Sequence, residues 1–376
     1  TGGTTGMPKG VMYTHGGHVR SLLNTAGAWG LVPVDKPLEI EDIHKEVLKI
    51  SQEDNLTVNI PGCPLMHGTG MWLGALIPHL VGGCAVTISQ LGFDPHHFFK
   101  EAERTKATNL VIVGDAFAKP MVDALDYAVD EGRPYKLDTI NSIVSSGVMW
   151  SSEVKQGLLK HHAFDLVDAM GSTEGGMGSS RTSRESSPET AKFQLNPGVI
   201  VITDEGEHVS PGSGVIGKIG TSGLVPEGYY KDQKKSAETF KDFEGKRYSF
   251  PGDYATVEED GSITLLGRGS NCINTAGEKV YPEEVEEAIK RNDSIYDCLV
   301  VGLTDDRFGQ KVVALASFIE GQEIEEQDLI ASTREYLAGY KLPKQVLFVE
   351  EVMRAPNGKA NYKWAKETAE KEIGQE

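Results

Sequence analysis

The sequence predicts an α/β fold: a large domain of parallel sheet with helices plus an antiparallel β region, followed by a small α+β C-terminal domain. Three observations predict it. Short apolar strands alternate with helical stretches through the first half of the chain, which is typical of a parallel sheet covered by helices. From about residue 198 the strands become short and turn-separated, which indicates antiparallel pairing. After GRGSN (267–271) the pattern changes again to a compact mixture of helices and strands.

The strand–helix alternation runs through residues 11–171. A strand at 11–15 and a helix at 16–29 come first, and a charged helix at 40–50 indicates a surface excursion. Strands and helices then follow in pairs: 84–89 with 94–105, 109–114 with 115–130, and 142–147 with 151–162, before a last strand at 164–171. Parallel neighbours need crossover connections, and helices of this length supply them.

The antiparallel region and the small domain come next. Strand patterns lie at 199–209, 214–220 and 248–268, and Asp260-Gly261 predicts a hairpin within the last of these. The small domain is expected to hold helices at 281–291 and 325–339 and strands at 298–303, 312–319 and 345–352. Residues 179–190 are typical of a mobile loop. The predicted domains are therefore 1–268 and 270–376.

The composition excludes several classes of function. The chain of 376 residues has a net charge of −18. This charge argues against binding to nucleic acids or anionic membranes, because both attract clustered Lys and Arg. No run approaches the roughly 18 apolar residues that a membrane span needs. Isolated cysteines fit a reducing cytosol, which predicts a cytoplasmic protein. These cysteines are Cys63, Cys84, Cys272 and Cys298.

The chain opens on TGGTTGMPKG, a stretch suited to binding phosphates. Glycines with unhindered backbone N–H groups and threonine hydroxyls form anion-binding loops, and a lysine adds a positive charge. The residues available for this are Gly3, Thr4, Thr5, Gly6 and Lys9. It is not a Walker A loop, because Gly10 follows the lysine where Ser or Thr is required. A plain hairpin turn is the alternative.

Two later stretches offer oxygen ligands. In DAMGSTEGG (168–176), Gly171 permits close approach to the backbone, while Thr173 offers a hydroxyl and Glu174 a hard ligand suited to Mg²⁺. The alternative for this Thr-Glu pair is a helix start. In FPGDYATV (250–257), Asp253 follows a Pro-Gly turn. Its carboxylate could accept hydrogen bonds from both hydroxyls of a ribose, or it could cap the turn.

Charged residues mark the second domain. Arg268 is a permanent cation at the expected boundary, and Gly277 leaves room for a ligand or a sharp turn. Pro282 begins a helix whose first turn is acidic, as the helix dipole favours. In RAPNGKANYKWAKE (354–367), Lys359 follows Asn-Gly in what is expected to be an exposed loop. A lysine in such a loop is ordinarily solvated surface.

Two patterns are set aside. GSGVIG (212–217) matches GxGxxG, but a strand pattern follows it and not the helix that a dinucleotide site requires. The pairs His96–His97 and His161–His162 lack a carboxylate partner at metal-ligand spacing and are expected on helix surfaces.

Taken in order, these stretches resemble the adenylate-forming superfamily, the acyl-CoA synthetases and their relatives. The opening loop resembles the phosphate loop of that family, and later motifs follow in the family's order across the whole chain. They are PLMHGTG, SSGVMWS, MGSTE, GYYKDQ, PGD, GRGSNCINTAGEKVYPEEVE and APNGKA. The chain looks closest to bacterial fatty-acyl or steroid-side-chain CoA ligases. Family members carry a long segment before the phosphate loop. The chain therefore resembles a member that lacks the N-terminal part of its AMP-binding domain.

The resemblance implies a role for each matching residue. Lys359, Thr173, Glu174 and Lys9 would be catalytic, with Mg²⁺ at Glu174 and Lys359 reaching in from a mobile small domain. Binding of ATP would fall to Thr4, Thr5, Gly6, Lys9, Gly147, Met170, Gly171, Ser172, Asp253 and Arg268. His67, Gly70, Met71 and Trp72 would border the acyl pocket, Gly277 would line the path of CoA, and Ser270 would be the hinge.

The implied reaction has two steps. ATP activates a carboxylic acid, expected to be a medium- or long-chain fatty acid or a steroid-side-chain acid, to acyl-AMP, and CoA then takes the acyl group as a thioester. The alternatives are loading of a carrier protein, or nucleotide binding without turnover. Three positions depart from the family pattern: Gly2 stands where a serine is usual, Met170 replaces an aromatic residue, and Ser270 replaces Asp or Lys at the hinge.

Overall fold

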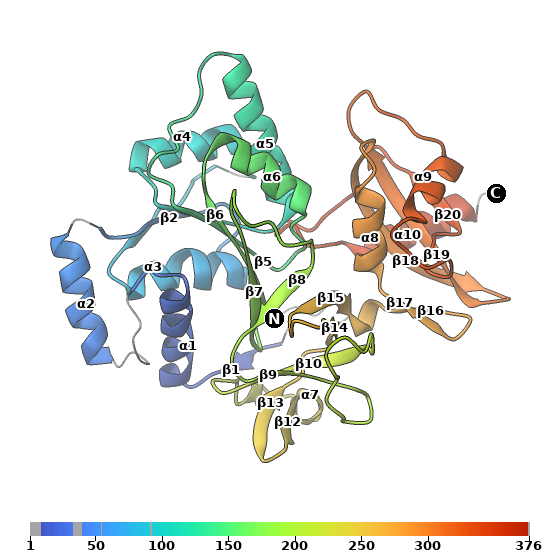
Figure 1. Cartoon of the computed structure of the whole chain (residues 1–376), viewed down its shortest axis with the longest axis horizontal. Helices are drawn as coiled ribbons and strands as arrows, with labels where there is room; N and C mark the ends of the chain where they lie inside the picture. The colour runs from blue at the N-terminus through green and yellow to red at the C-terminus, as the bar shows by residue number, and fades with distance from the viewer. Residues whose placement is uncertain (1–8, 33–39, 54, 91, 375–376) are drawn as a thin grey trace.

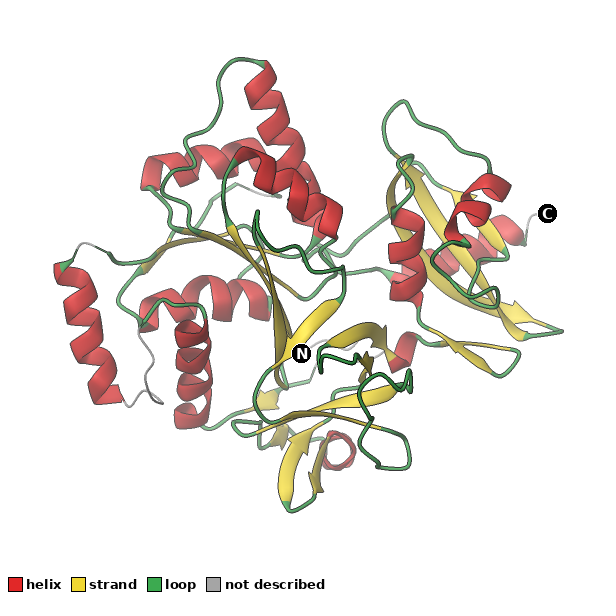
Figure 2. Ribbon diagram, in the orientation of Figure 1, coloured by secondary structure: helices red, strands yellow, loops and turns green. Residues whose placement is uncertain are grey.

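The computed structural model describes residues 9–32, 40–53, 55–90 and 92–374. Within these ranges the chain forms a 13-stranded sheet, a 5-stranded sheet and a two-stranded ribbon, with helices packed around the sheets (Figures 1 and 2). No helix in the described part of the chain is long and apolar enough to cross a membrane.

The first half of the large sheet is parallel, as the alternation predicted. Its strands lie in the order β6, β5, β4, β2 and β3. They are β2 (Val58–Pro61), β3 (Cys84–Ala85), β4 (Asn109–Ile112), β5 (Ser142–Ser146) and β6 (Asp165–Ser172). Helices α4 (Pro95–Thr105), α5 (Asp115–Asp130) and α6 (Ser152–His161) cover one face, and α1 (His15–Ala28) and α3 (Ile77–Leu80) lie on the other (Figure 1). The amphipathic helix α2 (Ile40–Gln52) lies at the periphery.

Local sequence accounts for where these helices begin and end. The Asp94 side chain caps α4 by accepting the N–H groups of His96 at 2.9 Å and His97 at 3.2 Å, and Pro95 fills the first helical position. The helix ends at Lys106, which adopts φ +53°. The expected placement of His96–His97 on this helix is confirmed, and the described residues contain no cluster of three metal-ligating side chains.

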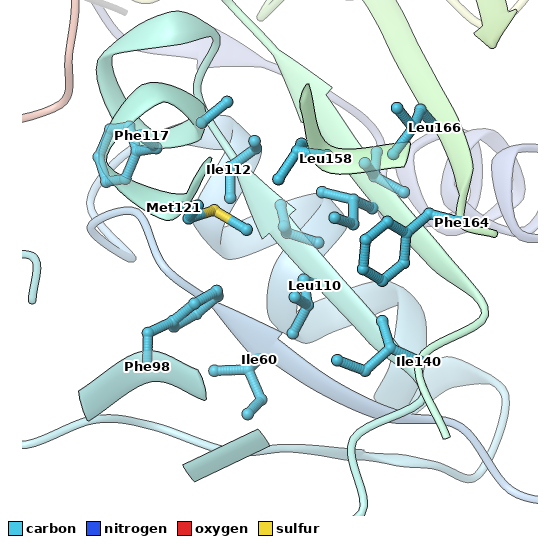
Figure 3. Packing of buried hydrophobic residues seen from close by; sticks show 14 of the residues in the cluster. Ile60, Phe98, Leu110, Ile112, Phe117, Met121, Ile140, Leu158, Phe164 and Leu166 are labelled. Atoms are coloured by element: carbon cyan, nitrogen blue, oxygen red, sulfur yellow. The ribbon is translucent and has the colours of Figure 1, made fainter. Parts of the chain in front are cut away.

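The main core lies between the parallel strands and α4–α6 (Figure 3). Leu110 and Ile112 point from β4 toward Phe98 of α4 and Met121 of α5, and all four side chains are fully buried. Burying such side chains contributes about 1.5–3 kcal/mol each before conformational entropy is subtracted. This core holds the carboxyl ends of β4, β5 and β6 in place beside the candidate site.

The second half of the sheet is antiparallel. From β6 it continues through β7, β8, β15, β14, β10, β13 and β12, while β9 also pairs with β10. These strands are β7 (Gly175–Thr182), β8 (Lys192–Leu195), β9 (Val199–Ile202), β10 (Gly217–Ser222), β12 (Phe240–Phe243), β13 (Lys246–Ser249), β14 (Asp253–Val257) and β15 (Ile263–Arg268). The hairpin predicted at Asp260-Gly261 is confirmed, because it joins β14 to β15. The strand predicted after GSGVIG is β10.

The prediction of a mobile loop at 179–190 is wrong for its first four residues. Ser179 to Thr182 belong to β7, where Thr182 pairs with Leu166 and Ser180 pairs with Asp168 of β6. Ser180 and Thr182 are buried although they are polar. As alternate residues of a strand, they point to the same, buried face of the sheet. The serine-rich composition of the stretch suggests a loop and hides this strand pattern.

Residues 272–374, called here the C-terminal module, follow the short 3-10 turn η2 (Gly269–Asn271). The module contains β16 (Ile273–Thr275), β17 (Glu278–Val280), α8 (Pro282–Lys290), β18 (Ile295–Asp305), β19 (Gly309–Phe318), α9 (Glu326–Thr333), β20 (Gln345–Phe348) and α10 (Tyr362–Ile373). Apolar clusters fill both faces of its sheet, one under α8 and α9 and one under α10. Helix α9 is shorter than the predicted 325–339, and α10 was not predicted.

Candidate active site

The Thr173–Glu174 turn joins β6 to β7, where the sheet changes from parallel to antiparallel pairing. Ser172 pairs with Gly175, which adopts φ +151° and leads directly into β7. The alternative of a helix start at this pair is therefore wrong. The side chain of Glu174 is buried, and its Oε1 accepts a hydrogen bond of 2.7 Å from the hydroxyl of Tyr229. A carboxylate is thereby held at the end of the two central strands.

The glycine before this turn lets the two strands approach each other. A β-bulge lies between Met170 and Gly171, and a Cβ at Gly171 would lie 3.1 Å from the carbonyl oxygen of Gly175. The Ser172 hydroxyl accepts the N–H of Glu174 at 3.2 Å. Met170 is buried in the core of the antiparallel region. The nucleotide-binding roles of these residues stay predictions.

Asp253 and Arg268 lie opposite each other on β14 and β15. Nε of Arg268 donates to Oδ1 of Asp253 at 3.2 Å, whereas Oδ2 of Asp253 is buried without a hydrogen-bond partner in the described structure. Burial raises the pKa of Asp253, and the positive charges of Arg268 and Lys359 oppose the rise. A buried acceptor without a partner fits the expected ribose hydroxyls, since unpaired buried oxygens are costly.

Lys359 is half-buried and not exposed as expected. A tight hairpin holds it: the N–H of Ala355 donates to the Lys359 carbonyl at 2.9 Å, and Gly358 adopts φ +78°. Arg354 at the base of the hairpin donates to both oxygens of Asp297, at 2.6 and 2.7 Å. These hydrogen bonds thus hold the backbone of the loop that carries the lysine.

The hairpin points Lys359 into the large sheet. A Cβ built on Gly147, at the end of β5, would lie 3.7 Å from Cε of Lys359 and 3.1 Å from Cε1 of His67. Burial lowers the pKa of Lys359, and Arg268 lowers it further, while Asp253 and Glu174 oppose the shift. Residues far apart in the sequence therefore meet around one ammonium group.

His67 shares this environment. Burial and the charge of Lys359 lower the pKa of His67 to about 4, so the imidazole is neutral at pH 7. Its Nδ1 is buried without a hydrogen-bond partner in the described part of the chain. A neutral ring next to a cation can accept or donate a hydrogen bond without adding charge.

The other expected acyl-pocket residues lie on a π-helix, η1 (Thr69–Leu76), which the sequence did not reveal. π-Helical turns are rare and occur frequently at functional sites. Gly70 is required there, because a Cβ would lie 2.4 Å from the carbonyl oxygen of Pro64. Met71 is partly exposed, and the Trp72 ring packs edge-on against His18 at 4.9 Å. Their role in an acyl pocket stays a prediction.

The phosphate loop is described only at its end. Thr4, Thr5 and Gly6 lie outside the described residues. Nζ of Lys9 lies 3.3 Å from Oδ2 of Asp232 and 5.3 Å from the centre of the Tyr229 ring. Since Tyr229 also binds Glu174, Lys9 and the Thr173–Glu174 turn share a neighbour.

Two expected residues lie elsewhere. Gly277 is exposed at the turn between β16 and β17 with φ +90°, and a Cβ there would meet nothing within 4 Å. Ser270 is exposed in η2. Gly277 is thus not gathered with Lys359 in this arrangement of the chain. The roles expected of Gly277 and Ser270 stay predictions.

The candidate site fits a magnesium–nucleotide complex better than a bare metal ion. Mg²⁺ is usually held by one or two carboxylates together with substrate phosphates and water. Glu174 offers one buried carboxylate at the turn, and the described residues hold no cluster of three acidic, His or Cys side chains. Glu174 would hold the ion together with the phosphates.

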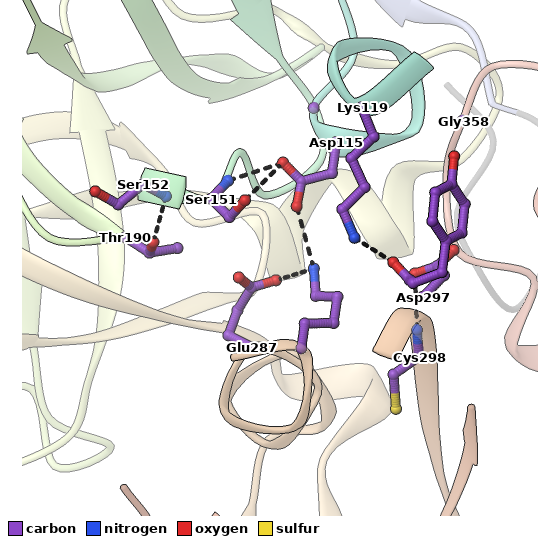
Figure 4. A network of polar contacts seen from close by, with 12 residues as sticks. Asp115, Lys119, Ser151, Ser152, Thr190, Glu287, Asp297, Cys298 and Gly358 are labelled. Atoms are coloured by element: carbon purple, nitrogen blue, oxygen red, sulfur yellow. Dashed lines mark hydrogen bonds and ion pairs between the residues drawn. The ribbon is translucent and has the colours of Figure 1, made fainter. Parts of the chain in front are cut away.

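A second set of charges joins the C-terminal module to the large sheet (Figure 4). Nζ of Lys290, on α8, lies 3.6 Å from Oδ2 of Asp115 at the start of α5 and also contacts Glu287. Lys119 of α5 donates to the carbonyl oxygen of Tyr296 in the module. A cleft of about 660 Å³ lies beside these contacts, between α5 and the loop that leads to Lys359. Sequence analysis missed this network.

Comparison with known families matches both parts of the chain. Residues 1–230 match the model of the AMP-binding enzymes, and residues 284–359 match the model of the AMP-binding enzyme C-terminal domain. The first match alone covers more than half of the chain.

Curated relatives match nearly the whole chain. The 3-oxocholest-4-en-26-oate–CoA ligase of Rhodococcus rhodochrous is 38% identical over 378 residues, covering 98% of this chain and 65% of the ligase. The medium/long-chain-fatty-acid–CoA/3-oxocholest-4-en-26-oate–CoA ligase of Mycolicibacterium smegmatis is 39% identical over 377 residues, covering 98% of this chain and 66% of the ligase. The chain therefore spans just under two thirds of the length of these relatives.

Solved structures share the fold. ATP-bound MatB from Rhodopseudomonas palustris superimposes with a TM-score of 0.77 at 21% identity, covering 97% of this chain and 66% of MatB. The anthranilate CoA ligase AuaEII in complex with anthranoyl-AMP gives a TM-score of 0.78 at 20% identity, covering 98% of this chain and 66% of AuaEII. With its motifs, fold and relatives in agreement, the chain belongs to the AMP-binding enzymes of the adenylate-forming superfamily.

Proposed function

We propose that this chain activates a carboxylic acid with ATP to acyl-AMP and then transfers the acyl group to CoA. The observation that carries the proposal is the position of Lys359 beside Gly147, where Arg268, Asp253 and Glu174 all act on its charge. A half-buried lysine at the end of a strand, close enough to two carboxylates and a guanidinium for their charges to act on it, is suited to bind an anion that forms during reaction.

In the first step, a carboxylate oxygen would bond to the α-phosphorus of ATP while the bond to pyrophosphate breaks. Lys359 would neutralise charge on the α-phosphate and the attacking carboxylate, and Lys9 would neutralise the departing phosphates. Asp253 would orient the ribose through the oxygen that has no partner in the described structure. Bound with ATP, Mg²⁺ neutralises charge on the phosphate oxygens. Positioning and charge neutralisation dominate such reactions.

In the second step, the CoA thiolate would attack the acyl carbon and AMP would leave. We propose that the domains are 1–268 and 270–376, and that the second rotates about Ser270 to withdraw Lys359 and present Gly277. Gly277 is exposed and lies apart from Lys359 in the present arrangement, which supports the assignment of the two residues to different steps. Transfer to a carrier protein is the alternative for this step.

The proposed acid is a medium- or long-chain fatty acid or a steroid-side-chain acid. The names of the two curated relatives support this class. The proposed location is the cytoplasm, in keeping with four isolated cysteines that are not joined by disulfides.

The experiment measures pyrophosphate release from Mg·ATP with acids from acetate to long-chain fatty and steroid acids, with and without CoA. Acid-dependent release would establish adenylation, and a need for CoA in turnover would identify the acceptor. A chain that binds ATP but releases no pyrophosphate with any acid would contradict the proposal.

Lys359→Ala separates the two steps. We expect acid-dependent pyrophosphate release to fall by about 10²–10³-fold, the usual effect of removing one group that stabilises transition-state charge. Thioester formation from supplied acyl-AMP should persist. Lys363→Ala is the matched control, because Lys363 lies four residues later with its side chain 84% exposed. Loss of both half-reactions in a folded Lys359→Ala chain would refute the role of this lysine.

A further inference from the structure

Two tyrosines hold the Thr173–Glu174 turn from outside the central sheet. Tyr229 belongs to the two-stranded ribbon of β1 (Val11–Met12) and β11 (Gly228–Tyr229), in which Val11 pairs with Tyr229, and Tyr13 directly follows β1. The hydroxyl of Tyr13 donates to the Thr173 carbonyl at 2.9 Å, and the hydroxyl of Tyr229 donates to Oε1 of Glu174 at 2.7 Å. Strand β1 begins directly after Gly10, the last residue of the opening TGGTTGMPKG stretch.

Each tyrosine contributes a neutral O–H donor to the turn, Tyr13 to the Thr173 carbonyl and Tyr229 to the Glu174 carboxylate. A neutral donor fixes a carboxylate without cancelling its charge, which a lysine or arginine in the same place would do.

The position of Tyr229 suits this purpose further. Nζ of Lys9 lies over its ring, 5.3 Å from the ring centre, while its hydroxyl donates to the carboxylate of Glu174. Tyr229 is 6% exposed, so the phenol has little freedom to turn away. A carboxylate offers about four lone-pair directions, and the phenol occupies one of them. Within the described residues no other hydrogen bond to this carboxylate occurs, so the remaining directions can serve a metal ion and ordered water.

We propose that Tyr229 is a positioning residue that orients the Glu174 carboxylate toward the divalent ion of the metal–nucleotide complex. Tyr13 supports the same turn through the backbone of Thr173. This inference rests on the proposed function for the identity of the nucleotide, and it concerns metal affinity, not the chemistry of the acid. It also gives a purpose to the ribbon between β1 and β11, which would otherwise be an isolated two-residue pairing.

The test uses Tyr229→Phe with Tyr230→Phe as the matched control. Tyr230 is the next residue, is 60% exposed, and loses the same single hydroxyl. Binding of Mn²⁺, as a paramagnetic probe for Mg²⁺, is measured by electron paramagnetic resonance in the presence of a non-hydrolysable ATP analogue. Binding of the same analogue in EDTA is measured separately. No turnover is needed in either measurement.

We expect Tyr229→Phe to weaken Mn²⁺ binding by roughly ten- to a hundredfold, as removal of a hydrogen bond to a charged group implies. Tyr230→Phe should match the wild type, and nucleotide binding in EDTA should be the same in all three chains. Tyr13→Phe, which removes a bond to a neutral carbonyl, should weaken Mn²⁺ binding by a smaller factor. It also provides a second variant if Tyr229→Phe fails to fold.

Three results would overturn the inference. The first is Mn²⁺ binding by Tyr229→Phe that is as tight as in the wild type. The second is a parallel loss of nucleotide binding in EDTA, which would indicate a merely structural role for Tyr229. Equal Mn²⁺ binding by Glu174→Gln and wild type would remove the carboxylate itself from the metal site. A chain that shows the expected metal effects but activates no acid would refute the proposed function and leave this inference standing.

Discussion

Replacing Asp115 by Asn tests whether the contact between α5 and α8 holds the C-terminal module in the arrangement that inserts Lys359. Oδ1 of Asp115 accepts the backbone N–H of Ser151 at 2.9 Å and its hydroxyl at 3.1 Å, and an amide oxygen can keep both bonds. Oδ2 faces Nζ of Lys290 at 3.6 Å. The substitution therefore removes the charge toward the module and spares the contacts within the large sheet.

The magnitude follows from the geometry. Two unit charges separated by 3.6 Å attract each other by about 4–5 kcal/mol at an effective dielectric constant of about 20. Desolvation offsets part of this, and Lys290 keeps its contact with Glu287, so the expected net loss is about 1–3 kcal/mol. Burial lowers the pKa of Lys290, but Glu287 and Asp115 raise it more, so the lysine stays charged. Removing the charge of Asp115 therefore removes an attraction to a charged partner. The docked arrangement should become roughly 5- to 150-fold less favourable.

The assay compares the two proposed half-reactions. Asp115→Asn should slow acid-dependent pyrophosphate release, which needs Lys359 in place, and should leave thioester formation from supplied acyl-AMP unchanged. The control is Asp130→Asn, an exposed carboxylate at the far end of α5. If Asp115→Asn carried out both half-reactions at the wild-type rates, the reasoning would be refuted. So would an equal loss in both together with a lower melting temperature, because Asp115 would then serve only to hold Ser151.

Two further predictions concern the C-terminal module. Gly277→Val places a β-branched residue at φ +90° on an exposed turn, so it should slow thioester formation while acyl-AMP forms at the normal rate; equal slowing of both steps would contradict the assigned role. Burial raises the pKa of Glu286 to about 8, so the folded chain keeps a proton that the unfolded chain releases above about pH 4.5. Stability should therefore fall as pH rises from about 5 to about 8, by up to about 1.4 kcal/mol per pH unit, and urea unfolding of Glu286→Gln should show a flatter dependence. If the stability of Glu286→Gln depended on pH as the wild type does, groups other than Glu286 would cause the pH dependence.

The fold class could be predicted because each element has a local signature. Strand β4 is a short apolar run, and α4 begins at an Asp-Pro pair that both caps and starts a helix. The π-helix η1 could not be predicted in this way. Its sequence, TGMWLGAL, is apolar on all sides, and its unusual hydrogen bonding depends on Gly70 packing against the backbone at Pro64.

The candidate site was only partly accessible to sequence analysis. Motifs identified Glu174, Asp253 and Lys359 as candidates, but a motif does not say what a side chain touches. Tyr229 binds Glu174 across 55 positions of the sequence, and Lys290 contacts Asp115 across 175 positions. Such pairs are created by the topology of the sheets. The same limit explains why Lys359 was expected on an exposed loop, since its burial comes from residues of another part of the chain.

The lowered pKa of Lys359 makes the docking of the C-terminal module sensitive to the charge of its own site. Burial and the Arg268 guanidinium both oppose a second cation there, so insertion of the lysine costs free energy when no anion is present. A bound triphosphate would remove that cost, and departure of pyrophosphate would restore part of it. Under the proposed mechanism, the first product thus loosens the module as it leaves, and the chain advances to its second step without a separate trigger.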